Sequence, residues 1–164
     1  MRRLRSEYRR VGTCLDSPVG ETRLVVDRAI RLVVRDTGEL DGGHLRGWWF
    51  LPGDGRPQVY RIELTANGST YETSGPDMFD ALVSLRRQIE PLGWLIALQG
   101  SRLDTYPSGM ARDMGGGLKV YVMRPGRAAT RADLVATLDD AEVAQLATVD
   151  EQRAYWDAWR TLDH

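Results

Sequence analysis

The amino-acid sequence predicts an α+β fold, in which helices pack on a largely antiparallel sheet of about five or six strands. Three observations lead to this prediction. Residues 60–65 alternate between apolar and polar side chains, an Asn-Gly pair follows them at residues 67–68, and helical spacing begins near residue 76. The expected element order is β-β-β-α-β-β-α. We expect residues 21–164 to form a single α+β domain, preceded by a mobile, arginine-rich arm at residues 1–20.

A three-stranded antiparallel meander is expected over residues 45–73. In "QVYRIELTA", Tyr60, Ile62 and Leu64 share one face, while the charged residues between them share the other. This period of two is typical of a half-buried strand. The Asn-Gly pair at residues 67–68 then supplies the positive φ angles of a type I′ hairpin turn.

A helix is predicted over residues 76–90, because apolar residues recur there every three or four positions. They are Met78, Leu82, Leu85 and Ile89. Ser74 and Asp77 resemble a capping pair at its start, and Pro91 and Gly93 are expected to end it.

Two later apolar segments, residues 94–98 and 118–122, are expected to be central strands that pair with each other. Apolar side chains on both faces are typical of a strand that is covered on each side. Thr148 and Glu151 have the spacing of a capping box, which predicts a final helix over residues 149–162. Its expected apolar stripe consists of Tyr155, Ala158, Trp159 and Leu162.

The predicted core combines the inward faces of these elements. The residues expected to be almost fully buried are Ile62, Leu64, Leu82, Leu85, Ile96 and Val120. The tryptophans assigned to core faces are Trp48, Trp94 and Trp159. Trp49 is assigned to the opposite strand face, and Trp156 flanks the helix stripe. Either a tryptophan lies at the surface, where tryptophan beside arginine is typical of binding hot spots, or both faces of the sheet are covered.

Composition excludes several kinds of protein. Hydrophobic residues make up 42% and charged residues 27% of the 164-residue chain, as in ordinary globular proteins. No apolar run is long enough for a membrane span, and the N-terminus lacks the apolar region of a secretory signal. The single cysteine, Cys14, excludes an internal disulfide and a cysteine-based zinc site. We expect a cytoplasmic protein that does not contact membranes.

Charge is distributed unevenly along the chain, although the formal net charge is −1. Residues 1–10 and 100–131 each carry +4, whereas residues 132–164 carry −6. Such polarity either steers a charged partner or belongs to a solvated surface. The basic segments raise the option of nucleic-acid binding, with Tyr106 or Tyr121 stacking on bases. The negative total argues against it.

The densest run of unusual residues is "TYPSGMARDMGGGLKVYVM" at residues 105–123. Its three consecutive glycines invite comparison with a phosphate-binding loop, but the lysine and hydroxyl positions of that motif do not match. We expect these glycines to permit a bulge or close backbone packing instead. They are Gly115, Gly116 and Gly117. We predict an ordered connection over residues 105–117, in which Arg112 and Asp113 either pair internally or present a recognition surface.

Signatures of catalysis and of metal binding are weak. Ser108 lacks the flanking glycines of a nucleophile elbow and is expected to fill a Pro-Ser-Gly turn. A Ser108-His44-Asp104 arrangement stays open, because His44 is the only histidine before the terminal residue. Three later carboxylates lack the spacing of a calcium loop. They are Asp139, Asp140 and Glu142. We expect no cofactor and no metal.

Three stretches carry a resemblance to known proteins: "ALQGSRLDTYPSGMARDMGGGLKVYVM", "DLVATLDDA" and "ATVDEQRAYWDAW". Over residues 98–159 the chain resembles small uncharacterised bacterial proteins associated with immunity in polymorphic-toxin and contact-dependent inhibition loci. The resemblance implies a non-catalytic protein that binds one toxin domain and masks its active site. The acidic tail from Asp133 would then suit a basic nuclease toxin.

Protein binding is therefore the leading functional hypothesis. The expected partner-binding residues are Arg112, Asp113, Asp139, Asp140, Glu142 and Trp156. Further candidates in residues 105–117 are Tyr106, Ser108, Gly115, Gly116 and Gly117. The alternative is a small enzyme, or a small-molecule-binding protein, with a pocket under residues 105–117.

Overall fold

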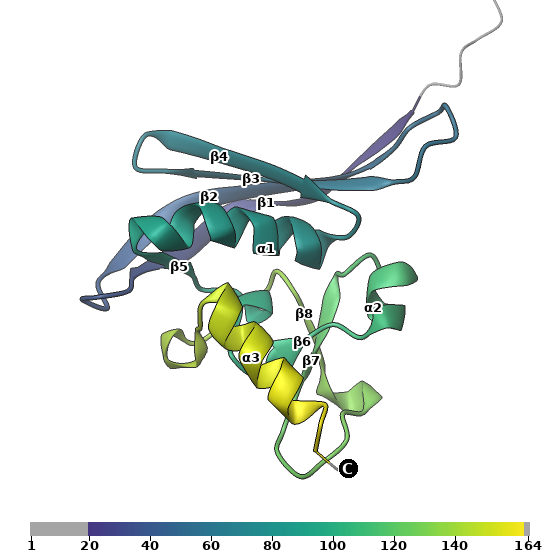
Figure 1. Ribbon diagram of the computed structural model, residues 1–164. Helices are drawn as coiled ribbons and strands as arrows, with labels where there is room; N and C mark the ends of the chain where they lie inside the picture. The colour runs from purple at the N-terminus through teal and green to yellow at the C-terminus, as the bar shows by residue number, and fades with distance from the viewer. Residues whose placement is uncertain (1–19, 163–164) are drawn as a thin grey trace, which may run out of the picture.

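A computed structural model describes residues 20–162 (Figure 1). It has an α+β fold with a largely antiparallel sheet, as the sequence predicts. The arginine-rich arm predicted over residues 1–20 lies outside the described residues, apart from Gly20, and so does Cys14.

The large sheet has five strands in the order β4-β3-β2-β1-β5, and every neighbouring pair is antiparallel. The strands are β1 (Glu21–Val34), β2 (Leu40–Leu51), β3 (Val59–Ala66), β4 (Ser69–Gly75) and β5 (Trp94–Ile96). The predicted meander over residues 45–73 is confirmed as β2, β3 and β4. In the turn between β3 and β4, Asn67 has a φ of 48° and Gly68 a φ of 76°. These are the positive angles that a type I′ turn requires.

A second, smaller sheet has the order β6-β7-β8. Its strands are β6 (Thr105–Tyr106), β7 (Lys119–Val122) and β8 (Leu134–Ala136). The predicted pairing of residues 94–98 with 118–122 is wrong. β5 pairs with β1 at the edge of the large sheet, whereas β7 is the centre of the small one. Apolar side chains on both faces of a strand indicate that both faces are buried. An edge strand between packed layers is buried in the same way, so this pattern does not predict which strand is the partner.

The described residues also form α-helices and single 3₁₀ turns. The helices are α1 (Met78–Ile89), α2 (Gly109–Asp113) and α3 (Val149–Trp159). The turns are η1 (Glu90–Leu92), η2 (Gln99–Ser101), η3 (Arg131–Asp133) and η4 (Val143–Gln145). Figure 1 shows α1 between the large sheet and a second layer that holds α2, α3 and the small sheet. The helix α1 therefore packs against other elements on two sides.

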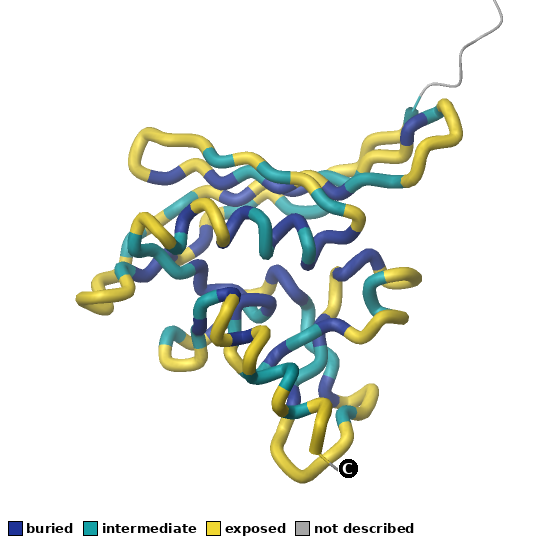
Figure 2. The backbone as a smooth tube through the Cα atoms, in the orientation of Figure 1, coloured by how far each residue is buried: buried dark blue, intermediate teal, exposed yellow. Residues whose placement is uncertain are grey.

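The core lies where α1 covers one face of the large sheet. All six residues predicted to be buried are confirmed, because none is more than 1% exposed: Ile62, Leu64, Leu82, Leu85, Ile96 and Val120. Figure 2 shows the buried positions on the inner strands and on α1, with the exposed ones at the turns.

The N-terminus of α1 uses a different cap from the predicted one. The carboxylate of Asp77, rather than the Ser74 side chain, accepts a hydrogen bond from the backbone N–H of Asp80 at 2.8 Å. Ser74 is still part of β4, where it pairs with Arg61. The helix therefore begins only after the strand has ended. Its end agrees with the prediction, since Gly93 adopts a φ of 91° after η1.

Two tryptophans lie on the strand faces opposite to those predicted. Trp49 packs against the core cluster. Trp48 lies on the outer face, with its ring 5.0 Å from the guanidinium of Arg46 and 5.5 Å from that of Arg61. Leu45 sets this alternation, because it is fully buried and strand side chains alternate in direction. Residues 47 and 49 then follow it inward.

A buried polar joint connects α1 to the second layer. Arg86 in α1 is 1% exposed. It donates hydrogen bonds to the carboxylate of Glu90 at 3.0 Å, to the Gln152 side chain at 2.6 Å and to the Ala147 carbonyl at 2.7 Å. Burial lowers the pKa of Arg86, and the charge of Glu90 opposes that shift. Glu90 also accepts the backbone N–H of Val149, at the first turn of α3, at 3.0 Å.

The predicted capping box of α3 is confirmed. The Thr148 hydroxyl accepts a hydrogen bond from the backbone N–H of Glu151 at 3.2 Å, and the Glu151 carboxylate accepts that of Thr148 at 2.8 Å. This backbone hydrogen bond is the main reason why the pKa of Glu151 is lowered. The start of the helix is therefore fixed by its own sequence.

The predicted apolar stripe of α3 is wrong in part. Tyr155 and Trp159 are half-buried, but Ala158 and Leu162 are exposed. The fully buried residues are at the other end of the helix, namely Val149 and Gln152. The helix packs mainly by its N-terminal half, and Gln152 is buried because the joint around Arg86 requires its amide.

The burial of Leu82 in the core predicts how much its truncation lowers the stability of the protein. Leu82→Ala removes a fully buried side chain of α1, so the free energy of unfolding in urea should fall by roughly 2–5 kcal/mol. The matched control is Leu40→Ala, because Leu40 is 58% exposed. It should change stability by less than about 0.5 kcal/mol. Equal effects of the two substitutions would contradict this account of the core.

Candidate functional site

The segment 105–117 is more regular than the ordered connection that its composition predicts. It begins with β6, continues through the short helix α2 and ends in a glycine turn. Ser108 is the N-cap of α2, and its hydroxyl accepts a hydrogen bond from the backbone N–H of Ala111 at 3.1 Å. The Pro-Ser-Gly sequence thus starts a helix, a role that serine serves well.

The glycine turn fixes α2 against the start of α1. Gly116 and Gly117 have φ angles of 60° and 66°, which favour glycine. The Gly116 carbonyl accepts the backbone N–H of Met78 at 2.8 Å. An added Cβ would lie 2.1 Å from the Tyr60 hydroxyl at residue 116, and 2.5 Å from the Asp77 carboxylate at residue 117. The glycines permit close backbone packing, as expected.

This anchoring leaves two methionines of α2 in solvent. Met110 is 72% exposed and Met114 84% exposed, more than any other large hydrophobic residue that the structure describes. They are four residues apart, so they project from neighbouring turns of the same helix face. Met110 lies in α2, and Met114 is the C-cap residue of this helix.

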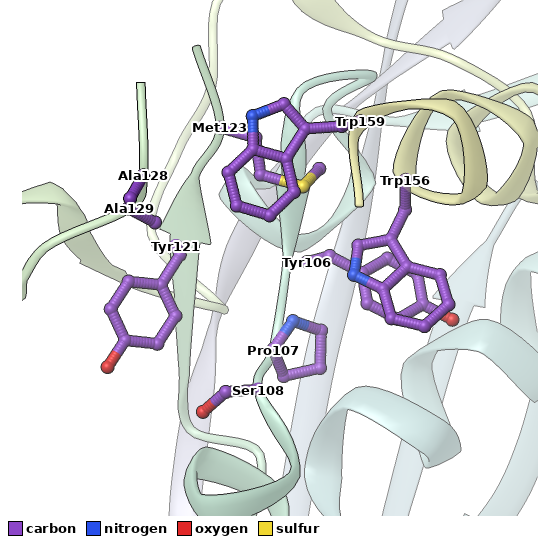
Figure 3. Close-up of a pocket in the computed structure, with 9 residues that line it drawn as sticks. All are labelled: Tyr106, Pro107, Ser108, Tyr121, Met123, Ala128, Ala129, Trp156 and Trp159. Atoms are coloured by element: carbon purple, nitrogen blue, oxygen red, sulfur yellow. The ribbon is translucent and has the colours of Figure 1, made fainter. Parts of the chain in front are cut away.

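A hollow of about 340 Å³ lies beside α2 and is lined by aromatic and small side chains (Figure 3). Its lining consists of Tyr106, Pro107, Ser108, Tyr121, Met123, Ala128, Ala129, Trp156 and Trp159. The rings of Tyr106 and Trp156 stack with centroids 4.6 Å apart and 20° between their planes. In Figure 3 this stacked pair faces Tyr121 across the hollow. No lining residue is charged.

A second hollow, of about 400 Å³, continues from the first, because Ser108 and Tyr121 line both. Its other lining residues are Met110, Ala111, Met114, Gly115, Leu118, Lys119 and Leu134. We call the two hollows together the α2 groove. It is an apolar surface feature built by β6, β7, α2 and α3, with one cationic side chain, Lys119, in its lining.

Arginines hold the aromatic wall of the groove. Arg153 and Arg160 each place a guanidinium 4.8 Å from the Trp156 ring centroid. Asp157 bonds to both of them at 3.1 Å, and Arg153 also donates to the Tyr106 hydroxyl at 3.3 Å. The hydrogen bond with Asp157 is the largest cause of the raised pKa of Arg153. Both charge and stacking therefore fix the position of Trp156.

Arg112 is half-buried and contacts groups at the start of α1. Its guanidinium lies 5.2 Å from the Phe79 ring centroid and 5.8 Å from that of Tyr106, and it is 3.7 Å from the Asp77 carboxylate. Asp113, the next residue, is exposed. Arg112 therefore pairs with Asp77 rather than with Asp113, and contact of either residue with a partner stays a prediction.

The predicted acidic candidates lie apart from the groove. Asp139, Asp140 and Glu142 are exposed, and none of them lines either hollow. Asp140 forms an ion pair with Arg28 of β1 at 2.9 Å. Of the predicted partner-binding residues, only Trp156 lies in the lining of the groove. The loop candidates Tyr106, Ser108 and Gly115 join it there.

The Ser108-His44-Asp104 arrangement is not formed. The His44 Nε2 is 2.5 Å from the Asp27 carboxylate, on the outer face of the large sheet. Asp104 accepts two hydrogen bonds from the Arg102 guanidinium, at 2.7 and 2.8 Å. Ser108 caps α2. Each member has a local partner, and no contact between the three is found in residues 20–162.

In residues 20–162, no group of three or more histidine, cysteine, aspartate or glutamate side chains is placed to hold a metal ion. No described helix combines the length and apolar character needed to cross a bilayer.

Neither the protein-family models nor the curated proteins give a match to the chain.

Sequence analysis missed several residues of the groove. Its pattern does not single out Met110 and Met114, and it suggests Tyr121 only for base stacking. The available signal is the pair of methionines at helical spacing beside a Pro-Ser-Gly helix start. The contribution of Trp159 is missed because its ring is assigned to the core, whereas its indole N–H donates to the Arg124 carbonyl at 3.0 Å beside the first hollow.

The glycine turn predicts a measurable steric cost. Gly126→Ala carries only the cost of a positive φ, of 71°, with nothing within 4 Å of the new Cβ, so it should destabilise by about 1 kcal/mol. Gly116→Ala adds a clash with Tyr60, and its loss of unfolding free energy should exceed that of the control by at least about 1 kcal/mol. Equal losses in denaturant titrations would show that the contact is unimportant.

Proposed function

We propose that the chain is a non-catalytic protein-binding module that neutralises a bacterial toxin domain, and that the partner contacts the segment 105–117. The observation that carries this proposal is the exposure of Met110 and Met114 beside an apolar groove. Large exposed apolar side chains next to an apolar hollow are typical of interaction surfaces. Methionine is suited to such a surface, because its flexible side chain adapts to the shape of a partner.

The aromatic wall supports a protein partner. Trp156 and Tyr106 are half-buried, stacked and braced by arginines before any partner arrives. Rigid aromatic side chains lose little conformational entropy on binding, and tryptophan, tyrosine and arginine dominate binding hot spots. The resemblance of residues 98–159 to immunity proteins covers the whole groove.

The acidic segment would act at longer range. Asp139 and Glu142 are exposed and form no ion pair with other described residues, while Asp140 is paired with Arg28. Carboxylates that do not contact the partner still raise its association rate when it is basic, because the attraction extends about a Debye length, roughly 8–10 Å. A toxin domain that is basic overall would therefore be drawn to this segment during approach, while a local part of its surface contacts the groove.

A second candidate function is the binding of a small apolar molecule. The observation that favours it is the volume of the hollows, about 340 and 400 Å³, which is at the small end of ligand sites. Turnover has less support, since the Ser108 hydroxyl already accepts a helix-capping hydrogen bond and, within residues 20–162, forms no hydrogen bond with a histidine, lysine or carboxylate side chain.

Co-expression tests the proposal. The chain, produced with the product of the neighbouring gene, should co-purify with it and rescue growth of cells in which that product is toxic. An empty vector is the control for rescue. No complex and no rescue would contradict the proposal. Turnover of a small substrate that is lost in Ser108→Ala or His44→Ala would favour an enzyme instead.

The same assay tests the acidic segment. Reversing Asp139, Asp140 and Glu142 to lysine should slow association with a basic toxin and weaken its dependence on salt, because steering acts through long-range charge. Folding should survive, since substitutions of exposed charges usually change stability by less than about 0.5 kcal/mol. An unchanged association rate in stopped-flow measurements would exclude this segment from recognition.

A further inference from the structure

The charges around the α2 groove are unbalanced. Lys119 lines the second hollow. Arg124 follows the lining residue Met123, and Arg131 lies between lining residues 129 and 134. All three cations are exposed, and none forms an ion pair with a described residue. Exposed cations without an ion-pair partner beside an apolar surface can form ion pairs with carboxylates of a bound partner.

The acids of the same segments do not offset this excess. Asp133 is buried, accepts hydrogen bonds from Thr130 and forms an ion pair with Arg127 at 2.5 Å. Asp157 is shared between two arginines of α3. Only Asp113, on α2, is exposed and without an ion pair in the described chain. The exposed, unpaired charges of the segments that line the groove are therefore net positive, and we call Lys119, Arg124 and Arg131 the rim cations.

A second copy of the chain is a poor occupant for such a surface. A two-fold dimer through the groove would place two net-positive copies of the same surface against each other. Like charges across an interface are unfavourable. Nucleic acid would suit the cations, but it would leave Met110 and Met114, the most exposed apolar side chains, without apolar contact.

We propose that the α2 groove binds a segment of a partner protein that carries large apolar side chains flanked by carboxylates. The inference rests on the proposed binding function and adds the chemistry of the bound segment. Apolar side chains would enter the hollows between the Tyr106–Trp156 stack and Met114. The carboxylates would meet Lys119, Arg124 and Arg131 at the rim. Apolar contact would supply affinity, and the charges would select against basic segments.

Peptide display tests this chemistry directly, because it does not require the partner to be identified. A library of random peptides, displayed on phage, is selected on the immobilised chain at physiological salt. We expect enriched peptides to be net negative and to contain at least two large apolar residues. Retention of the enriched peptides should fall at least about tenfold on the double variant Met110→Glu with Met114→Glu. The substitutions remove the apolar contact of the two methionines, and the added charges repel the carboxylates of the peptides. Leu92→Glu is the matched control, since Leu92 is 57% exposed outside the groove.

Charge reversal provides a second variant that leaves the apolar residues intact. Lys119→Glu with Arg131→Glu should weaken binding of the enriched peptides and reduce its dependence on salt. Arg56→Glu, on an exposed arginine remote from the lining residues, should not. Thermal unfolding of each variant checks that it is folded.

Several results would overturn the inference. They are the absence of enrichment over a blank surface, enrichment of net-positive peptides, and equal retention by the Met110→Glu, Met114→Glu variant. A dimer in light scattering that dissociates in that variant would assign the groove to a second copy. Oligonucleotide binding that is lost in Lys119→Glu would assign it to nucleic acid. Co-purification of the toxin with an unweakened groove variant would overturn this inference and the proposed contact at residues 105–117, but would leave toxin neutralisation standing. Enrichment of acidic peptides without formation of any toxin complex would support this inference but contradict the proposed function.

Discussion

The guanidinium of Arg86 is the contact on which the arrangement of the two layers depends. It is buried in α1, at 1% exposure, and donates to groups in the second layer: the Gln152 side chain and the carbonyls of Gly100 and Ala147. Removing a buried charge from its partners is costly, because the partners stay desolvated. The joint therefore favours one relative placement of α1 and α3, where an apolar contact alone would tolerate sliding. Its role is positional, since a buried ion pair is weak evidence for net stability.

Gln152 transmits this placement to the groove. Its amide nitrogen donates to the carbonyls of Gly100, Arg102 and Thr105, at 2.8–2.9 Å. Thr105 begins β6, and the next residue, Tyr106, stacks on Trp156 one helical turn beyond Gln152. On the other side, the glycine turn ties α2 to the start of α1. Both walls of the groove are thus held in position by contacts with α1. The exposed methionines and cations of the groove therefore lie on a rigid support, as binding surfaces require.

The sequence predicts the large-sheet meander, α1, the start of α3 and the buried face of α1, because each depends on local periodicity or capping. It does not predict which strands pair over long distance: residues 94–98 and 118–122 have similar patterns but belong to different sheets. The predicted faces of Trp48 and Trp49 are the reverse of the observed ones, because glycine in this strand has no side chain and so weakens the alternation signal. Within the site, Trp156, Tyr106 and the glycines can be singled out by composition, but their convergence with Met114 and Trp159 depends on tertiary contacts. Gln152, a polar residue on a helix, carries no local sign that it is buried.

Hydrogen exchange of a Gln152→Met variant tests most directly whether the joint positions the groove. Methionine keeps the approximate volume of the side chain but cannot donate to the three carbonyls, so β6 should open more readily. The account predicts faster amide exchange at β6 and at its partner β7, with β2 and β3 as protected as in the unmodified chain. Unchanged exchange in β6 and β7, or an equal loss of protection in every strand, would contradict it.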